Sequence, residues 1–125
     1  MDYLTGAASM LILDSMYLSV VKPRWANMVK NIQGTEISMR YNSAAGVYLL
    51  MSFALYYFIV KQKRSVYDAA LLGLVIYGVF DLTNYALFNK YSLFLGLLDM
   101  FWGAFLFGAS AYITYLISRF FNKRK

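Results

Sequence analysis

The sequence has no cysteine and no histidine among its 125 residues, and it has a single proline. Without cysteine and histidine there can be no disulfide, no thiolate or imidazole metal ligand, no cysteine nucleophile and no Ser-His-Asp triad. Charged residues are also few, at 14%, whereas 61% of the chain is hydrophobic. Soluble domains carry a much larger charged fraction, so this composition predicts a protein whose solvent is a membrane.

The positive charge of the chain is spread over several short segments. Its twelve Lys and Arg residues give a formal net charge of +6, and they lie in clusters between apolar runs instead of forming one basic face. Clusters of this kind are typical of the loops that flank membrane helices. We therefore expect the lipid bilayer as partner and no nucleic acid.

Four apolar segments are long enough to cross a bilayer, which takes about 20 residues. They cover residues 3–21, 42–60, 67–88 and 92–118. We expect Lys22-Pro23-Arg24 to end the first segment, Lys61 to Arg64 to separate the second from the third, and Asn89-Lys90-Tyr91 to form a tight turn before the fourth. The predicted fold is an all-α, integral membrane bundle of four transmembrane helices, forming a single domain over residues 1–125.

The long connection between the first two segments also has a helical pattern. Its apolar residues recur at i, i+3, i+4 and i+7, at Trp25, Met28, Val29 and Ile32. This spacing predicts a short helix lying in the membrane interface. The alternative is an irregular loop, which Gly34 and the short length of the segment would favour.

The basic residues of the loops predict the orientation of the bundle. Seven lie on the side of the two termini, namely Lys61, Lys63, Arg64, Arg119, Lys123, Arg124 and Lys125. Five lie on the other side, namely Lys22, Arg24, Lys30, Arg40 and Lys90. Because cytoplasmic loops carry the excess of positive charge, this difference favours both termini in the cytoplasm.

Three of the apolar segments contain one aspartate each. Asp14 lies eight residues from Lys22, about 12 Å along a helix, and Asp81 and Asp99 each lie nine residues from Lys90, about 13 to 14 Å. Since both lysines fall on the same side of a four-helix bundle, the three carboxyl groups are predicted to share one depth. An ionisable group inside the membrane costs several kcal/mol and is a functional-site candidate by default.

Helical phase predicts which side chains surround these aspartates. Polar and aromatic residues fall on the same helix faces or at the same depth, so the candidate polar or ion site consists of Asp14, Tyr17, Tyr48, Ser52, Tyr77, Asp81, Asn84, Tyr85, Asp99 and Trp102. A stripe of small residues, Ala104, Gly108 and Ala111, lies on another face of the fourth segment. It suits close helix packing within the bundle or contact with a second copy in a homo-oligomer.

Three functions fit such a site. Hydrogen bonds between protonated aspartates, Asn84 and the tyrosines would fix the register of the helices, and this structural or assembly role is the one that we favour from the sequence. Alternatively, repulsion and desolvation would leave at least one carboxyl protonated, so that the site binds a proton or a small cation such as Na⁺ or Ca²⁺ and serves a small transporter or channel component. A lipid-acting membrane enzyme is the third reading, with an aspartate as general acid or base. No catalytic residues, cofactor or resident metal are predicted.

Several of these residues belong to recognisable motifs. The chain reads Leu13-Asp14 in its first segment, Y-G-V-F-D-L-T-N-Y-A from Tyr77 to Ala86, and D-M-F-W-G from Asp99 to Gly103. Over nearly its whole length it resembles the predicted membrane proteins grouped as domain of unknown function 2177. The resemblance implies the four-helix topology and marks Asp14, Asp81, Thr83, Asn84, Asp99, Trp102 and Gly103 as motif positions. The family often has Trp three residues after the first aspartate, where this chain has Tyr17, and it brings no established activity.

Overall fold

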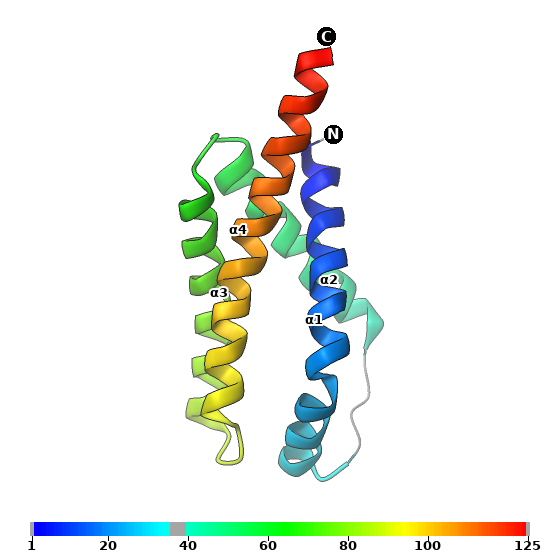
Figure 1. The fold of residues 1–125 in the computed structure, drawn as a ribbon. Helices are drawn as coiled ribbons and strands as arrows, with labels where there is room; N and C mark the ends of the chain where they lie inside the picture. The colour runs from blue at the N-terminus through cyan, green and yellow to red at the C-terminus, as the bar shows by residue number, and fades with distance from the viewer. Residues whose placement is uncertain (1, 36–39, 125) are drawn as a thin grey trace.

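The computed structural model describes residues 2–35 and 40–124, and within these ranges every long element is a helix. The elements are α1 (Asp2–Gln33), α2 (Tyr41–Leu55), the π-helical turn η1 (Tyr56–Val60), α3 (Val66–Leu87) and α4 (Leu93–Arg124). The four helices run alternately up and down, with both termini at the same end (Figure 1). The predicted all-α bundle is confirmed, and four helices are long and apolar enough to span a membrane. Two parts of the sequence predictions lie outside the described residues: residues 36–39 of the first connection, and Lys125 of the basic C-terminus.

The predicted end of the first helix at Lys22-Pro23-Arg24 is wrong, because α1 continues through Pro23 to Gln33. Proline removes one backbone hydrogen bond and is disfavoured inside a helix. Here tertiary packing outweighs that preference, since Met28 is buried against the turn that joins α3 to α4, with Trp25 and Ile32 beside it. The short helix predicted after the first span is thus the last part of α1. At 32 residues α1 is about 48 Å long, more than the roughly 30 Å of hydrocarbon.

The second span agrees with its predicted bounds but ends in a wider turn. The N–H of Lys61 donates to the carbonyl oxygen of Tyr56 at 2.7 Å, five residues back, and this closes η1. Lys63 then adopts a positive φ of 56°, which turns the chain into α3. The first turn of α3 is capped by the Ser65 hydroxyl, which accepts from the N–H of Asp68 at 3.0 Å.

The helices pack to unequal extents. α3 packs along α4, and α4 in turn packs on α1, whereas α2 crosses α1 obliquely with a smaller contact and has little direct contact with α3 (Figure 1). Two glycines permit the close α3–α4 contact. A Cβ atom on Gly73 would lie 2.1 Å from the carbonyl oxygen of Gly103, and one on Gly103 would lie 2.4 Å from the Tyr77 ring. Gly108 of the small-residue stripe also faces α3, 3.5 Å from Ala70 on the same measure, which is packing within the bundle.

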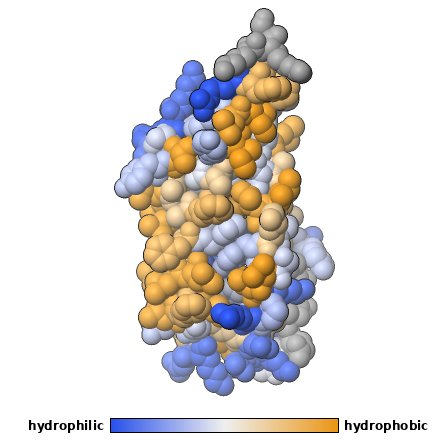
Figure 2. All heavy atoms as spheres, viewed as in Figure 1, coloured by the Kyte–Doolittle hydropathy of each residue, from blue (hydrophilic) through white to orange (hydrophobic). Residues whose placement is uncertain are grey.

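The apolar core lies in the half of the bundle nearer the termini. Met10, Leu106 and Phe107 are fully buried there, together with Leu55 and Ala111. The outer surface is also strongly apolar, and Figure 2 shows hydrophobic side chains over the middle of the molecule and hydrophilic ones toward its two ends. Lipid tails solvate such a surface, so its exposure is the expected state of a membrane bundle.

Candidate functional site

The carboxyl groups of Asp14, Asp81 and Asp99 all point into the bundle, with exposures of 7%, 1% and 8%. They come from α1, α3 and α4 respectively. Asp81 lies six residues before the last residue of α3 and Asp99 six residues after the first residue of α4. Because the two helices pack antiparallel across a tight turn, these equal spacings bring the two carboxyls to the same level, about 9 Å from the helix ends.

Asp14 connects three helices. Its Oδ1 accepts a hydrogen bond from the indole Nε1–H of Trp102 on α4 at 3.0 Å. Its Oδ2 accepts one from the hydroxyl of Tyr48 on α2. Both carboxyl oxygens are therefore bonded to neutral donors from neighbouring helices, which is the arrangement that a structural role requires.

Asp99 is joined to this network through Tyr17. The Tyr17 hydroxyl donates to Oδ1 of Asp99 at 3.3 Å. The Tyr17 ring stacks on the Trp102 indole with a centroid distance of 4.5 Å and an interplanar angle of 5°. The stack holds the two donors in fixed positions, so that the Tyr17 hydroxyl donates to Asp99 while the Trp102 indole donates to Asp14.

Asp81 has a different environment. The Tyr91 hydroxyl donates to its Oδ1 at 2.7 Å, and its Oδ2 is buried without a hydrogen-bond partner among the described residues. The Asp99 carboxyl is close enough to interact with the Asp81 carboxyl across the α3–α4 contact. Neither of two carboxylates can donate a hydrogen, so a hydrogen bond between these groups requires that one of them carries a proton.

From the sequence, Tyr91 was placed in the tight turn before the fourth segment, and its contact with Asp81 was missed. It lies in the turn between α3 and α4, where Met28 and Leu95 pack around it. Burial and the neighbouring Asp81 carboxyl raise the pKa of Tyr91 above its ordinary value, so the phenol keeps its hydrogen. The short length of the turn could have predicted this contact. The side chain of a tyrosine just before α4 is long enough to contact residues in the last turns of α3.

The other predicted site residues lie around the aspartates without bonding to them. Tyr77 directs its hydroxyl at the sulfur of Met51, 3.9 Å away, and Ser52 is buried next to it on α2. Asn84 is half-buried within hydrogen-bonding range of Tyr91.

Tyr85, which was predicted at the site, is 47% exposed on the outer surface. Tyr91 occupies the position over Asp81 that helical phase suggested for Tyr85. The motif residue Thr83 is exposed as well, whereas Gly103 is buried in the α3–α4 contact.

The residues around the three carboxyl groups limit which ligands these groups can bind. Among the described residues, no group of three acidic side chains converges closely enough to hold a metal ion. Ca²⁺ takes six to eight oxygen ligands, whereas a proton needs two. Toward the termini the site is closed by the buried apolar side chains of Met10, Leu106 and Phe107. Toward the membrane, a hollow of about 350 Å³ between α2 and α3 reaches Asp99.

Comparison with known proteins identifies one family. The model of the family described as "Predicted membrane protein (DUF2177)" matches residues 1–116, which is nearly the whole chain. The match includes all three aspartates and their tyrosine and tryptophan donors. No curated protein and no solved structure matches the chain.

Proposed function

The chain belongs to the DUF2177 family of predicted membrane proteins, and on that premise we propose that it is a proton-binding membrane protein in which Asp81 and Asp99 share one proton, while Asp14 holds the bundle together. The supporting observation is the buried Oδ2 of Asp81, which has no donor and lies beside a second carboxyl. The three aspartates thus have two roles. Proton binding of this kind would suit a small transporter or channel component.

The charge balance favours a shared proton. The donors that reach the two carboxyls are the phenols of Tyr17 and Tyr91, which are neutral. Two adjacent carboxylates would therefore combine mutual repulsion with the large desolvation penalty of an ion in a membrane. One proton between Asp81 and Asp99 removes a full charge and also gives the unpartnered oxygen a hydrogen bond. Because the neighbouring side chains on the terminal side are apolar, we infer a binding site and not an open channel through one copy of the chain.

The assembly role favoured from the sequence is assigned to Asp14. Its two oxygens receive hydrogen bonds from two other helices, and the Trp102–Tyr17 stack continues the network to Asp99. Interhelical hydrogen bonds in membranes contribute about 0.6 to 2 kcal/mol each, so the Asp14 network stabilises one arrangement of three helices.

Substitution of each aspartate tests both roles. Asp81 and Asp99 each accept from one tyrosine, so an Asn there keeps the accepting oxygen and supplies an N–H₂ toward the other carboxyl. At position 14 an Asn would keep both contacts, because the Tyr48 hydroxyl can accept from its N–H₂, so the test is Asp14→Leu, which removes both acceptors. We expect Asp14→Leu to lower the free energy of unfolding by about 1 to 3 kcal/mol, and Asp81→Asn and Asp99→Asn to change it by less than about 1 kcal/mol.

The measurement is thermal unfolding of the purified full chain in one lipid or detergent environment, with the three single variants side by side. A double variant, Asp81→Asn with Asp99→Asn, completes a mutant cycle and should show a coupling of about 0.5 to 3 kcal/mol. If Asp81→Asn and Asp99→Asn are as destabilising as Asp14→Leu, the shared proton is disproved. If Asp14→Leu is tolerated, the structural role of Asp14 is disproved instead.

A further inference from the structure

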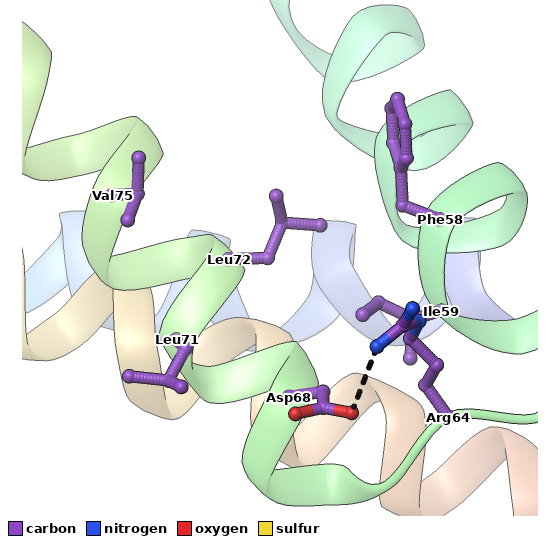
Figure 3. Close-up of a pocket in the computed structure, with 7 residues that line it drawn as sticks. All are labelled: Phe58, Ile59, Arg64, Asp68, Leu71, Leu72 and Val75. Atoms are coloured by element: carbon purple, nitrogen blue, oxygen red, sulfur yellow. Dashed lines mark ion pairs between the residues drawn. The ribbon is translucent and has the colours of Figure 1, made fainter.

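A second candidate site lies between the α2–η1 segment and α3. Near the termini it forms a hollow of about 370 Å³ between Phe58 on η1 and Leu72 and Val75 on α3, with Arg64 and Asp68 at its outer end (Figure 3). We call this hollow and its continuation toward the site the α2–α3 cleft.

The continuation is a second hollow, the one that reaches Asp99, which is lined by Leu50 on α2 and by Ile76 and Phe80 on α3 and shares no lining residue with the first. Along α3 the lining residues are Asp68, Leu72, Val75, Ile76 and Phe80, which follow one another at helical spacing. They therefore form one stripe. The two hollows follow each other along this stripe from the first turn of α3 to the level of Asp99, where α2 and α3 have little direct contact.

The dimensions of the α2–α3 cleft match one lipid chain. From Asp68 to Phe80 there are twelve residues, a length of about 18 Å. One leaflet of a bilayer has about 15 Å of hydrocarbon, half of the roughly 30 Å core. Its walls are aliphatic and aromatic side chains, and Val75 is 59% exposed. An acyl chain can follow this stripe over the full depth of its leaflet.

The outer end of the cleft is basic. Arg64 forms a salt bridge with Asp68, with 3.5 Å between Nη1 and Oδ2, and its side chain is still 60% exposed (Figure 3). Lys61 and Lys63 are close by in sequence, so three cations and one anion leave a net positive charge at this end. The Tyr115 hydroxyl donates to the carbonyl oxygen of Arg64 and holds its backbone in place. A guanidinium is suited to binding two phosphate oxygens at once, and the exposed part of the Arg64 side chain is available for such a contact.

We propose that the α2–α3 cleft binds one anionic phospholipid, with its phosphate on Arg64 and one acyl chain extending along α3 toward Asp99. The basic outer end selects an anionic headgroup, and the apolar stripe accepts the chain. This inference does not rest on the shared proton of Asp81 and Asp99. The bound chain would cover the side of Asp99 that faces the membrane.

Native mass spectrometry of the full-length protein, delipidated and then titrated with phosphatidylglycerol or phosphatidylcholine, tests the proposal. We expect tighter binding of phosphatidylglycerol, and we expect Arg64→Gln to weaken it about fivefold, the effect of one basic residue near an anionic headgroup. The matched control is Arg24→Gln, which removes an exposed arginine at the opposite end of the bundle. Equal binding by the two variants would overturn the role of Arg64.

A second pair of variants tests the apolar part. Val75→Trp places an indole in the cleft, whereas Val20→Trp places one on the exposed surface of α1, where Val20 is 77% exposed and lines neither hollow. Both positions are exposed, so neither change should prevent folding. Val75→Trp should reduce binding of both lipids, and Val20→Trp should not. Equal effects of the two variants, or a dimer in which residue 75 of one copy crosslinks to another copy, would show that no lipid chain occupies the cleft.

Discussion

The number of hydrogen-bond donors that reach a carboxyl distinguishes Asp14 from the other two aspartates. Asp14 has a donor on each oxygen, whereas Asp81 has one oxygen bonded to Tyr91 and one without a partner. Burial alone does not separate them, because Asp14 and Asp99 are almost equally exposed, at 7% and 8%. The chemistry of each aspartate is thus set by its neighbours and not by its depth.

Tyr91→Phe tests the contact with Asp81. Removing the hydroxyl leaves Oδ1 of the buried Asp81 carboxyl without its donor, so the free energy of unfolding should fall by about 1 to 3 kcal/mol. The same change at Tyr112, which is exposed on α4, should have an effect within about 0.5 kcal/mol. If the two variants unfold alike, the hydrogen bond to Asp81 does not stabilise the protein.

The raised pKa of Tyr91 adds a pH dependence to this prediction. Above pH of about 10, the ordinary value for tyrosine, the unfolded chain loses the Tyr91 proton while the folded chain keeps it. The folded state then binds more protons, so stability falls as the pH rises. Tyr91→Phe should therefore show a shallower alkaline loss of stability than the wild type. If the stability of the wild type and of Tyr91→Phe falls equally steeply with pH in the alkaline range, the raised pKa of Tyr91 is contradicted.

Sequence reasoning located the aspartates and most of their donors, but not every contact. Counting from Lys22 and Lys90 predicted a common depth, and helical phase suggested Tyr17 and Trp102, which the structure brings to the carboxyls. It could not distinguish Tyr85 from Tyr91, because which of two long side chains covers Asp81 depends on the path of the turn. It also could not show which oxygen lacks a donor.

At the scale of the helices, the close contact of α3 and α4 positions the proton site. Gly73→Ala would place its Cβ 2.1 Å from a backbone carbonyl oxygen, so the helices must separate. Overpacking typically costs about 1 to 3 kcal/mol, and we expect a loss of stability near the top of this range, because a backbone carbonyl cannot move aside as a side chain can. In Gly46→Ala on α2 the new Cβ meets nothing within 4 Å, and the change should be neutral or stabilising by up to about 1 kcal/mol. Thermal unfolding of the two variants measures the difference in their free energies of unfolding. Equal stability of Gly73→Ala and Gly46→Ala would refute the close packing of α3 and α4.

The bounds of the helices were predictable where local signals agree with packing. The tight turn between α3 and α4 and the capping of α3 by Ser65 follow from local sequence. The course of α1 does not, because the effect of Pro23 is local whereas the burial of Met28 involves residues more than sixty positions away. Amphipathic spacing at Trp25 and Ile32 was the better guide to that segment.

At the scale of the whole molecule, the orientation in the membrane stays a prediction from the loop charges. The natural absence of cysteine allows a direct test, since a single introduced cysteine is the only thiol. In intact cells, Lys63→Cys on the side of the termini should resist a membrane-impermeant thiol reagent until the membrane is opened, and Lys90→Cys on the other side should react from outside. The reverse labelling pattern would place the termini outside the cytoplasm.

We propose that Asp81 and Asp99 hold one proton between them inside the bundle. Infrared spectroscopy of the protein in lipid at neutral pH measures this most directly, through the carbonyl stretch that only a protonated carboxyl gives. The account predicts such a band in the wild type, its loss in Asp81→Asn and in Asp99→Asn, and its persistence in Asp14→Asn. A wild-type spectrum without the band, or a band that only Asp14→Asn removes, would contradict it.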